Sequence, residues 1–453
     1  MGYFDFKNRP KKTNCLADVD ILGCYDFNTC IISLDSLAKH DVERLTASAG
    51  GRNIEAVASN LCQLTPEQYG DIRKVLSLAA HEYTHFLDAT STIWGLSHLA
   101  LMNKAYMSNF KLGGKEHEFY WAKRFFNHCR NIRFPEYYTV VETGVENTRP
   151  WSSEVTLGYI FDANGNISNK PVIFSKFVNA EGHLLARSPV STVSLLEASA
   201  TAQELSVEAC LLRLTDEDFR LVEWRQFSEI TMAHLYNKEL TEYSVCSHLV
   251  SQAQKCRDVL DTFTLCSNII RVVLNCPSKV IDRLSKRCAV GQIVGISEDT
   301  DRAKRLRNGL KIGDLGTLFY LVLSALPRRE YQGVKEINSG IAEAISAIGL
   351  DASSLTAMRD ERANQLLDEL SKSPIKSIRQ LAQAGYENLY AMDIGASVLS
   401  GKLNLPPTWL GDGGVLQLFQ HESNSLRDFD LDACFEELYM GQSWADRFAE
   451  ACL

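Results

Sequence analysis

The chain has 453 residues, of which 45% are hydrophobic and 23% charged, so it can bury a large core in roughly two or three domains. Its net charge of −9 argues against a general surface for nucleic acids or anionic membranes. The 13 cysteines include no C-x-x-C pair, the N-terminus has no apolar signal core, and the longest apolar run, Leu315–Leu326, is too short to span a bilayer. We therefore expect a protein of the reducing cytoplasm.

The N-terminal residues predict a β-hairpin followed by a short helix. Two apolar runs, Val19–Cys24 and Thr29–Leu34, flank the turn-forming residues Asp26-Phe27-Asn28, a pattern typical of two strands joined by a turn. A loop at Gly50-Gly51 precedes a helical segment that we expect to end near Leu64.

A long helix is predicted to begin after Thr65. Thr65 can cap the first turn, Pro66 suits the first helical position, and Gln68 completes a capping box. The apolar pattern then continues to about Thr90. This helix carries the segment His81-Glu82-Tyr83-Thr84-His85 in its last third.

In a helix, His81 and His85 lie on one face, with Cβ atoms roughly 5–6 Å apart. Two imidazoles at this spacing can share one Zn²⁺ at about 2.0–2.1 Å each. Glu82 is rotated by about 100° from His81 and can take a proton from a zinc-bound water, which is the H-E-x-x-H arrangement. The uncharged surroundings predict a buried helix, in which these polar groups are costly unless a metal satisfies them. The alternative is two core histidines that contact carboxylates.

Helices and strands follow in turn. Helices are expected at Trp94–Phe110 and Glu116–Asn131. A small antiparallel sheet is expected next, with a hairpin turn at Asp162-Ala163-Asn164-Gly165-Asn166. Its predicted strands are Tyr137–Glu142, Val155–Phe161, Val172–Val178 and Gly182–Arg187.

The remainder of the sequence has a helical pattern. One helix is expected at Thr192–Glu204, and the next starts at Thr215 with Asp218. The Gly-rich and charged stretch Val290–Gly313 is expected to be a flexible loop. A boundary near residue 215 separates a mixed part, residues 1–215, from an all-helical part, residues 216–453. The predicted fold class is α+β and predominantly α.

Three further patterns are given structural interpretations. A basic cluster is expected on a solvated helix face, with a polyanion site as the alternative; it comprises Arg302, Lys304, Arg305, Arg307 and Lys311. The residues Gly411-Asp412-Gly413-Gly414 are expected to form a turn, because no Lys-Ser/Thr follows as in a phosphate-binding loop. Small core residues are the interpretation of four cysteines spaced by ten, Cys246, Cys256, Cys266 and Cys276.

A zinc site needs a third protein ligand, and an open fourth position if it is catalytic. Glu197 is the favoured third ligand, because the small residues that follow it, Ala198-Ser199-Ala200, allow a close approach of its helix. Glu204 shares its face and can orient a ligand or replace Glu197, and Glu208 is a further alternative. Asp88 is a candidate acceptor for an imidazole N–H, and the alternative is a plain residue at the end of the helix.

The segments His81-Glu82-Tyr83-Thr84-His85 and Leu196-Glu197-Ala198-Ser199-Ala200 together resemble gluzincin-type zinc metallopeptidases over residues 15–215. The resemblance implies a zincin-like N-terminal part, Zn²⁺ held by His81, His85 and Glu197, and Glu82 as general base. Metzincins are excluded, since Asp88 and Ser91 stand where they have Gly and His. The thermolysin-type pattern has Asn and Asp where this chain has Leu196 and Thr201, so no known subgroup is assigned.

Zincins also use a strand that pairs with the substrate and a side chain that stabilises the oxyanion. The candidate strands are Thr29–Leu34 and Gly182–Arg187. Candidates for the oxyanion, each with a structural role as the alternative, are His183, Arg187, His234, Tyr236 and Tyr243.

The main hypothesis is a cytoplasmic zinc-dependent endopeptidase that hydrolyses peptide bonds of an intracellular protein, with Glu82 as the catalytic residue. The expected partner is a protein or peptide substrate, without nucleic acid or membrane, and the helical part is expected to cover the cleft or select that partner. One alternative is a non-catalytic, zinc-stabilised helical interaction protein, which does not need Glu82. Another is a metal-dependent hydrolase of a non-peptide amide.

Overall fold

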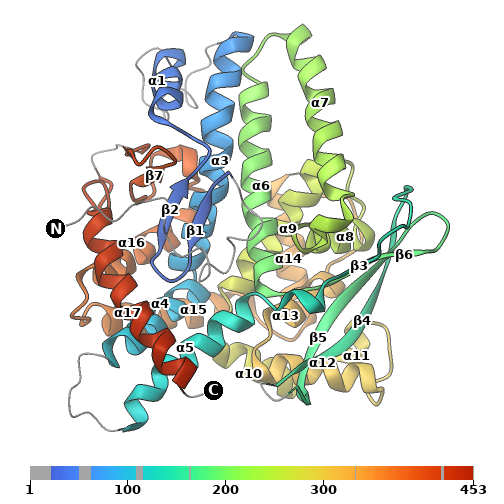
Figure 1. Ribbon diagram of the computed structural model, residues 1–453. Helices are drawn as coiled ribbons and strands as arrows, with labels where there is room; N and C mark the ends of the chain where they lie inside the picture. Colours follow the sequence, from blue (N-terminus) through green and yellow to red (C-terminus); the bar gives the residue numbers. More distant parts are fainter. Residues whose placement is uncertain are drawn as a thin grey trace. The chain divides into compact units, whose positions relative to one another are not determined.

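Figure 1 shows the computed structural model of the chain, which describes residues 22–49, 63–108, 116–162, 165–331, 333–419 and 423–451. Helices dominate, and the strands of the described residues form two sheets of four strands each. The predicted class, α+β and predominantly α, is confirmed. The helix expected after Gly50-Gly51 falls in residues 50–62 and lies outside the described residues.

Contacts between residues divide the chain into two compact units, each assembled from separate segments. Unit 1 comprises Met1–Arg130, Gln203–Trp224 and Ala363–Leu453, and unit 2 comprises Asn131–Ala202 and Arg225–Arg362. These units differ from a division at residue 215. Every boundary falls inside a helix, and the four helices concerned are α5 (Glu116–Ile132), α6 (Thr192–Leu212), α7 (Glu217–Leu235) and α15 (Ala352–Leu370).

The longest helix of unit 1 is α3 (Pro66–Thr90), which begins and ends close to where the sequence predicts. The Thr65 hydroxyl accepts the Gln68 N–H at 3.3 Å, and the Gln68 side chain accepts the Thr65 N–H at 3.0 Å, so the capping box is present. After a short break, α4 (Ile93–Met107) starts with the Thr92 hydroxyl accepting the Gly95 N–H. A Cβ on Gly95 would lie 2.4 Å from the Ala89 carbonyl carbon, so this close turn needs a glycine.

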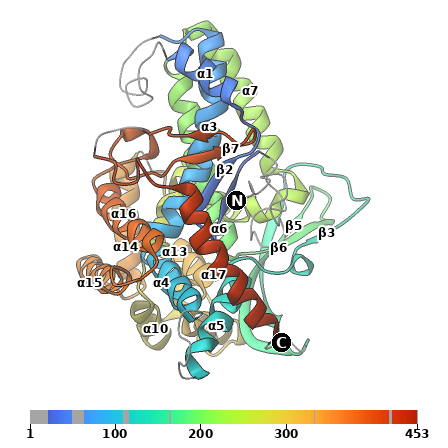
Figure 2. The same ribbon diagram turned by 60° about the vertical axis from the view of Figure 1, so that its left-hand side comes forward.

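The first sheet belongs to unit 1 and has the order β1-β2-β7-β8. Its strands are β1 (Cys24–Asp26), β2 (Ile31–Leu34), β7 (Thr408–Leu410) and β8 (Val415–Leu416). The β1–β2 hairpin is antiparallel, as predicted, whereas β2 pairs in parallel with the distant β7. Figure 2 shows β2 beside β7, and β2 also contacts α3. The prediction that residues 216–453 are all helical is wrong in this detail, because β7 and β8 complete the N-terminal sheet.

Three further helices complete unit 1. They are α1 (Lys39–Ser48), α16 (Lys376–Asp393) and α17 (Leu431–Ala451). The helix α16 crosses the end of α3 so closely that a Cβ on Gly385 would lie 2.1 Å from the Thr90 carbonyl oxygen. The aromatic rings of Tyr83 and Phe86 are fully buried on α3, which therefore runs through the core of this unit.

Unit 2 contains the second sheet, which is antiparallel throughout, as predicted, in the order β3-β6-β5-β4. Its strands are β3 (Val140–Val141), β4 (Ser152–Phe161), β5 (Ile167–Val178) and β6 (Leu184–Pro189). As the expected hairpin requires, β4 and β5 pair in antiparallel fashion, and the Asp162 N–H donates to the Asn166 carbonyl at 2.9 Å; residues 163 and 164 of the expected turn lie outside the described residues. Short 3₁₀ helices lie at η4 (Glu136–Tyr138) and η5 (Lys238–Leu240), and a third in unit 1 at η6 (Val398–Ser400).

Two of the remaining helices of unit 2 lie in a stretch that the sequence analysis expected to be a loop. They are α8 (Thr241–Ala253), α9 (Val259–Leu274), α10 (Ser278–Arg287), α11 (Val290–Ile293), α12 (Asp301–Ile312), α13 (Leu315–Ala325) and α14 (Val334–Ala347). The prediction of a flexible loop at Val290–Gly313 is wrong, since α11 and α12 occupy most of it. The basic cluster lies on α12, where Arg305 and Arg307 form ion pairs with Asp301 and Glu298.

Of the helices in the described residues, none is by itself both long and apolar enough to cross a membrane. The consecutive helices α9 and α10, which meet at 97°, meet that criterion of length and composition only as a bent pair.

Candidate metal centre

The two histidines of the H-E-x-x-H segment lie next to each other on α3, as their spacing predicts. Their ring centroids are 4.9 Å apart, and the rings are inclined by 74°. The two residues between Glu82 and His85 have structural roles: the Tyr83 hydroxyl donates to the Pro406 carbonyl at 2.6 Å, and the Thr84 hydroxyl donates to the Ala80 carbonyl at 2.6 Å. These bonds fix the face of α3 that carries the imidazoles.

The helix α6 carries the acidic residues that face α3. Glu204 Oε2 lies 2.9 Å from His81 Nδ1, and Glu208 Oε1 accepts the Arg73 Nε–H at 3.1 Å. These two contacts are one turn apart on α6 and align it with α3 (Figure 1). Since α6 is continuous from Thr192 to Leu212, it also sets the place of Glu197.

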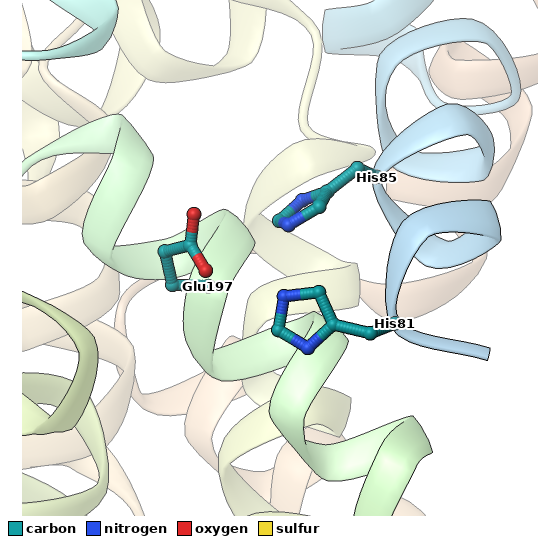
Figure 3. Close-up of side chains that lie close together, drawn as sticks. All are labelled: His81, His85 and Glu197. Atoms are coloured by element: carbon teal, nitrogen blue, oxygen red, sulfur yellow. The ribbon is translucent and has the colours of Figure 1, made fainter. Parts of the chain in front are cut away.

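Figure 3 shows His81 and His85 from α3 and Glu197 from α6 pointing toward one another. One nitrogen of each imidazole and one carboxylate oxygen of Glu197 all lie within 4.8 Å of one another, and the three residues are buried. Two imidazoles and a carboxylate are a donor set that transition metals, zinc among them, accept. The group can hold a metal ion, as predicted from the residues, and its donors do not by themselves name the metal.

The protonation of the imidazoles suits coordination. Burial lowers the pKa of His85 well below its usual value, and the neighbouring His81 lowers it further, so His85 is neutral at pH 7. A neutral imidazole is the form that binds metals. His81 Nδ1 lies 2.9 Å from Glu204 Oε2, and the His81 tautomer that carries its proton on Nδ1 donates this bond and presents Nε2 as the nitrogen that can bind a metal. Glu204 therefore contacts His81, and the orienting role considered for it from the sequence stays a prediction.

Glu82 is 1% exposed and is buried against the start of β1. A Cβ added to Gly23, the residue before this strand, would lie 3.0 Å from both Cγ and Oε1 of Glu82. Glu82 therefore has a fixed, enclosed place beside His81. The contact predicted between Asp88 and an imidazole stays a prediction.

The alternative ligand Glu208 is engaged elsewhere. It is bound to Arg73, and burial raises the pKa of its carboxyl, an effect that the Arg73 guanidinium partly offsets. Its structural role is to join α6 to α3.

Neither strand proposed for the substrate has a free edge. The β2 strand, which contains most of Thr29–Leu34, lies between β1 and β7, and β6, which overlaps Gly182–Arg187, lies between β3 and β5. Because both neighbours already bond to them, this prediction was wrong.

The candidates for the oxyanion have varied surroundings. His183 and His234 are exposed, and Arg187 lies with its guanidinium carbon 4.8 Å from the centre of the Phe174 ring. Tyr236 packs edge-on against Trp151, with 5.2 Å between ring centroids. Tyr243 lies on α8, and its role stays a prediction.

One ion pair near Glu197 has no signal in the sequence. Arg133 Nη2 lies 3.3 Å from Glu242 Oε2, and both side chains are largely buried within unit 2. Burial raises the pKa of Glu242, Arg133 opposes this rise, and the negative charge of Glu197 adds to it. The carboxylates of Glu242 and Glu197 are therefore close enough to interact, although 45 positions separate them in the chain.

Comparison of the chain with protein-family models, with curated proteins and with solved structures gave no match.

Proposed function

We propose that the protein is a cytoplasmic zinc-dependent endopeptidase of the gluzincin type that acts on an intracellular protein. The observation that carries the proposal is the buried group of His81, His85 and Glu197, two of whose members flank Glu82 in an H-E-x-x-H segment. A structural zinc site has four protein ligands, whereas three ligands leave a position for water or substrate. Among the described residues, this group offers three protein ligands, as a catalytic zinc site does.

His81, His85 and Glu197 would hold the metal, and Glu204 would keep His81 in the required orientation through Nδ1. A bound Zn²⁺ supplies a Lewis acid that polarises the peptide carbonyl and makes water more acidic. Glu82 then accepts the proton of the attacking water and passes it to the nitrogen of the leaving amine. Its place in the buried surroundings of Gly23 and α3 keeps bulk water from competing for that proton.

The test compares the purified wild-type chain with Glu82→Gln. Metal content is measured by mass spectrometry, and new protein N-termini are mapped after expression of each form in cells. We expect one zinc per chain in both proteins and new N-termini only with the wild type. Glu67→Gln, an exposed residue in the first turn of the same helix, serves as the matched control and should cleave like the wild type.

Each other outcome selects a different function. Stoichiometric zinc in both proteins without any new N-termini would favour the zinc-stabilised interaction protein or the amide hydrolase. A wild-type chain that binds no metal would exclude all three functions.

A further inference from the structure

Alternate residues at the start of the first sheet face α3. The Tyr25 ring packs edge-on against Phe86 with 6.3 Å between centroids, and the Phe27 ring against His85 with 6.5 Å. Gly23 lies two positions before Tyr25 and faces the same helix, as the period of two in an extended segment requires. Two successive facing positions thus carry large rings, and the third carries no side chain.

The space left by Gly23 is filled from α3. A Cβ at position 23 would lie 3.0 Å from Glu82 Cγ, 3.0 Å from Glu82 Oε1 and 3.1 Å from Leu78 Cδ1. Carbon atoms in favourable contact are about 3.5–4.0 Å apart. An alanine at position 23 therefore needs Glu82 to move by several tenths of an ångström, and the carboxylate moves with its stem.

The backbone at position 23 has little freedom to move away. The Leu22 carbonyl accepts the Ser36 N–H at 2.8 Å, and Cys24 pairs with Ser33 in the β1–β2 ladder. On the other side, Glu82 lies in the middle of a long buried helix. Since hydrogen bonds hold both backbones in place, the side chain of Glu82 has to move when a methyl group is added at position 23.

We propose that Gly23 is a positioning residue for Glu82: the side chain that it lacks makes the space that holds the Glu82 carboxylate in place. The consequence for catalysis rests on the proposed function, in which Glu82 is the base. A reacting group misplaced by about 1 Å can cost on the order of 100-fold in rate. The shift expected here is smaller, so we expect Gly23→Ala to lower kcat about tenfold, with KM little changed.

The first experiment tests the packing without any assumption about function. The melting temperature of the metal-free full chain is measured for the wild type, Gly23→Ala, Glu82→Ala and the double variant. Gly23→Ala should lower the melting temperature by a few degrees in the wild-type chain and by less than half as much when Glu82 is alanine, because the contact with Glu82 has gone. Equal losses in both backgrounds would overturn the proposal.

Gly70→Ala is the matched control for this cycle. Gly70 lies on the same helix, and a Cβ there would meet nothing within 4 Å. Its substitution should change the melting temperature equally in both backgrounds, since the site is exposed and distant from Glu82.

The second experiment measures zinc content and peptide cleavage. Gly23→Ala should bind zinc like the wild type, because His81 and His85 keep their places, and should cleave more slowly through kcat. Cleavage at the wild-type rate would overturn the positioning role. A zinc-loaded wild type that cleaves no peptide would remove the proposed function, while the melting temperatures would still decide whether Gly23 holds Glu82.

Discussion

Replacing Glu204 by alanine should weaken zinc binding about tenfold without unfolding the protein. The carboxylate lies 2.9 Å from His81 Nδ1, and in the proposed metal centre it would accept the Nδ1 proton, so that Nε2 binds the metal. A hydrogen bond to a charged group contributes about 1.5–3 kcal/mol. Because the Glu204 side chain is 36% exposed, water can replace part of this bond, so the lower end of the range applies. About 1.4 kcal/mol corresponds to a tenfold change in affinity.

The affinity is measured by titrating the metal-free chain with Zn²⁺ in competition with a chromophoric chelator. Glu208→Ala is the control, because Glu208 lies one turn further on α6 and binds Arg73 rather than an imidazole. It should lower the melting temperature and leave the affinity for zinc unchanged. The reasoning would be refuted by wild-type affinity in Glu204→Ala, or by an equal loss in the Glu208→Ala control.

Two further predictions concern pH. Burial lowers the pKa of His98 from 6.5 to about 4, so the folded state binds fewer protons than the unfolded chain, and stability should fall by about 3 kcal/mol as pH drops from 6.5 to 4. Urea unfolding at several pH values should show this loss of stability. The variant His98→Gln, which keeps an N–H for the Phe27 carbonyl, should lose less stability over the same interval, and equal losses in both proteins would contradict the prediction. Burial raises the pKa of Asp314 from 3.8 to about 6. Its contribution to the free energy of unfolding is therefore fully present below pH 3.8 and is lost as pH rises through 6. Asp314→Asn, which keeps an acceptor for the Thr317 N–H, should show no such decline over this interval; a slope equal to that of the wild type would contradict it.

The parts of the structure that sequence predicted best are those that neighbouring residues determine. The capping box at Thr65 and Gln68 fixes where α3 begins, and helix geometry then places His81 and His85 on one face. The pairing of the neighbouring strands β4 and β5 is equally local. Glu197 could be named because its helix has small residues and because the H-E-x-x-H segment required a third ligand.

Contacts between distant segments were beyond local patterns. The pairing of Ser33 with Trp409 in β2 and β7 has no counterpart in the spacing of residues near either strand. The ion pair of Arg133 with Glu242 is set by the fold of unit 2 in the same way. Both features depend on tertiary structure and were missed for that reason.

The error at Val290–Gly313 has a different cause. Signals for a helix were present, since the Thr300 hydroxyl caps α12 by accepting the Ala303 N–H, and Gly313 ends it in the left-handed conformation. The glycines and charges of this stretch were interpreted as a loop, although a charged helix face is equally consistent with them.

The continuity of α6 has a consequence for shortening this chain. The helix runs without a break from Thr192 to Leu212 and carries both Glu197 and Glu204. A fragment that stops between these two residues would keep one carboxylate and lose the other, and would end in a cut helix whose last carbonyl groups lack their helical partners. A truncation inside α6 would therefore remove either a member of the candidate metal group or the carboxylate that contacts His81.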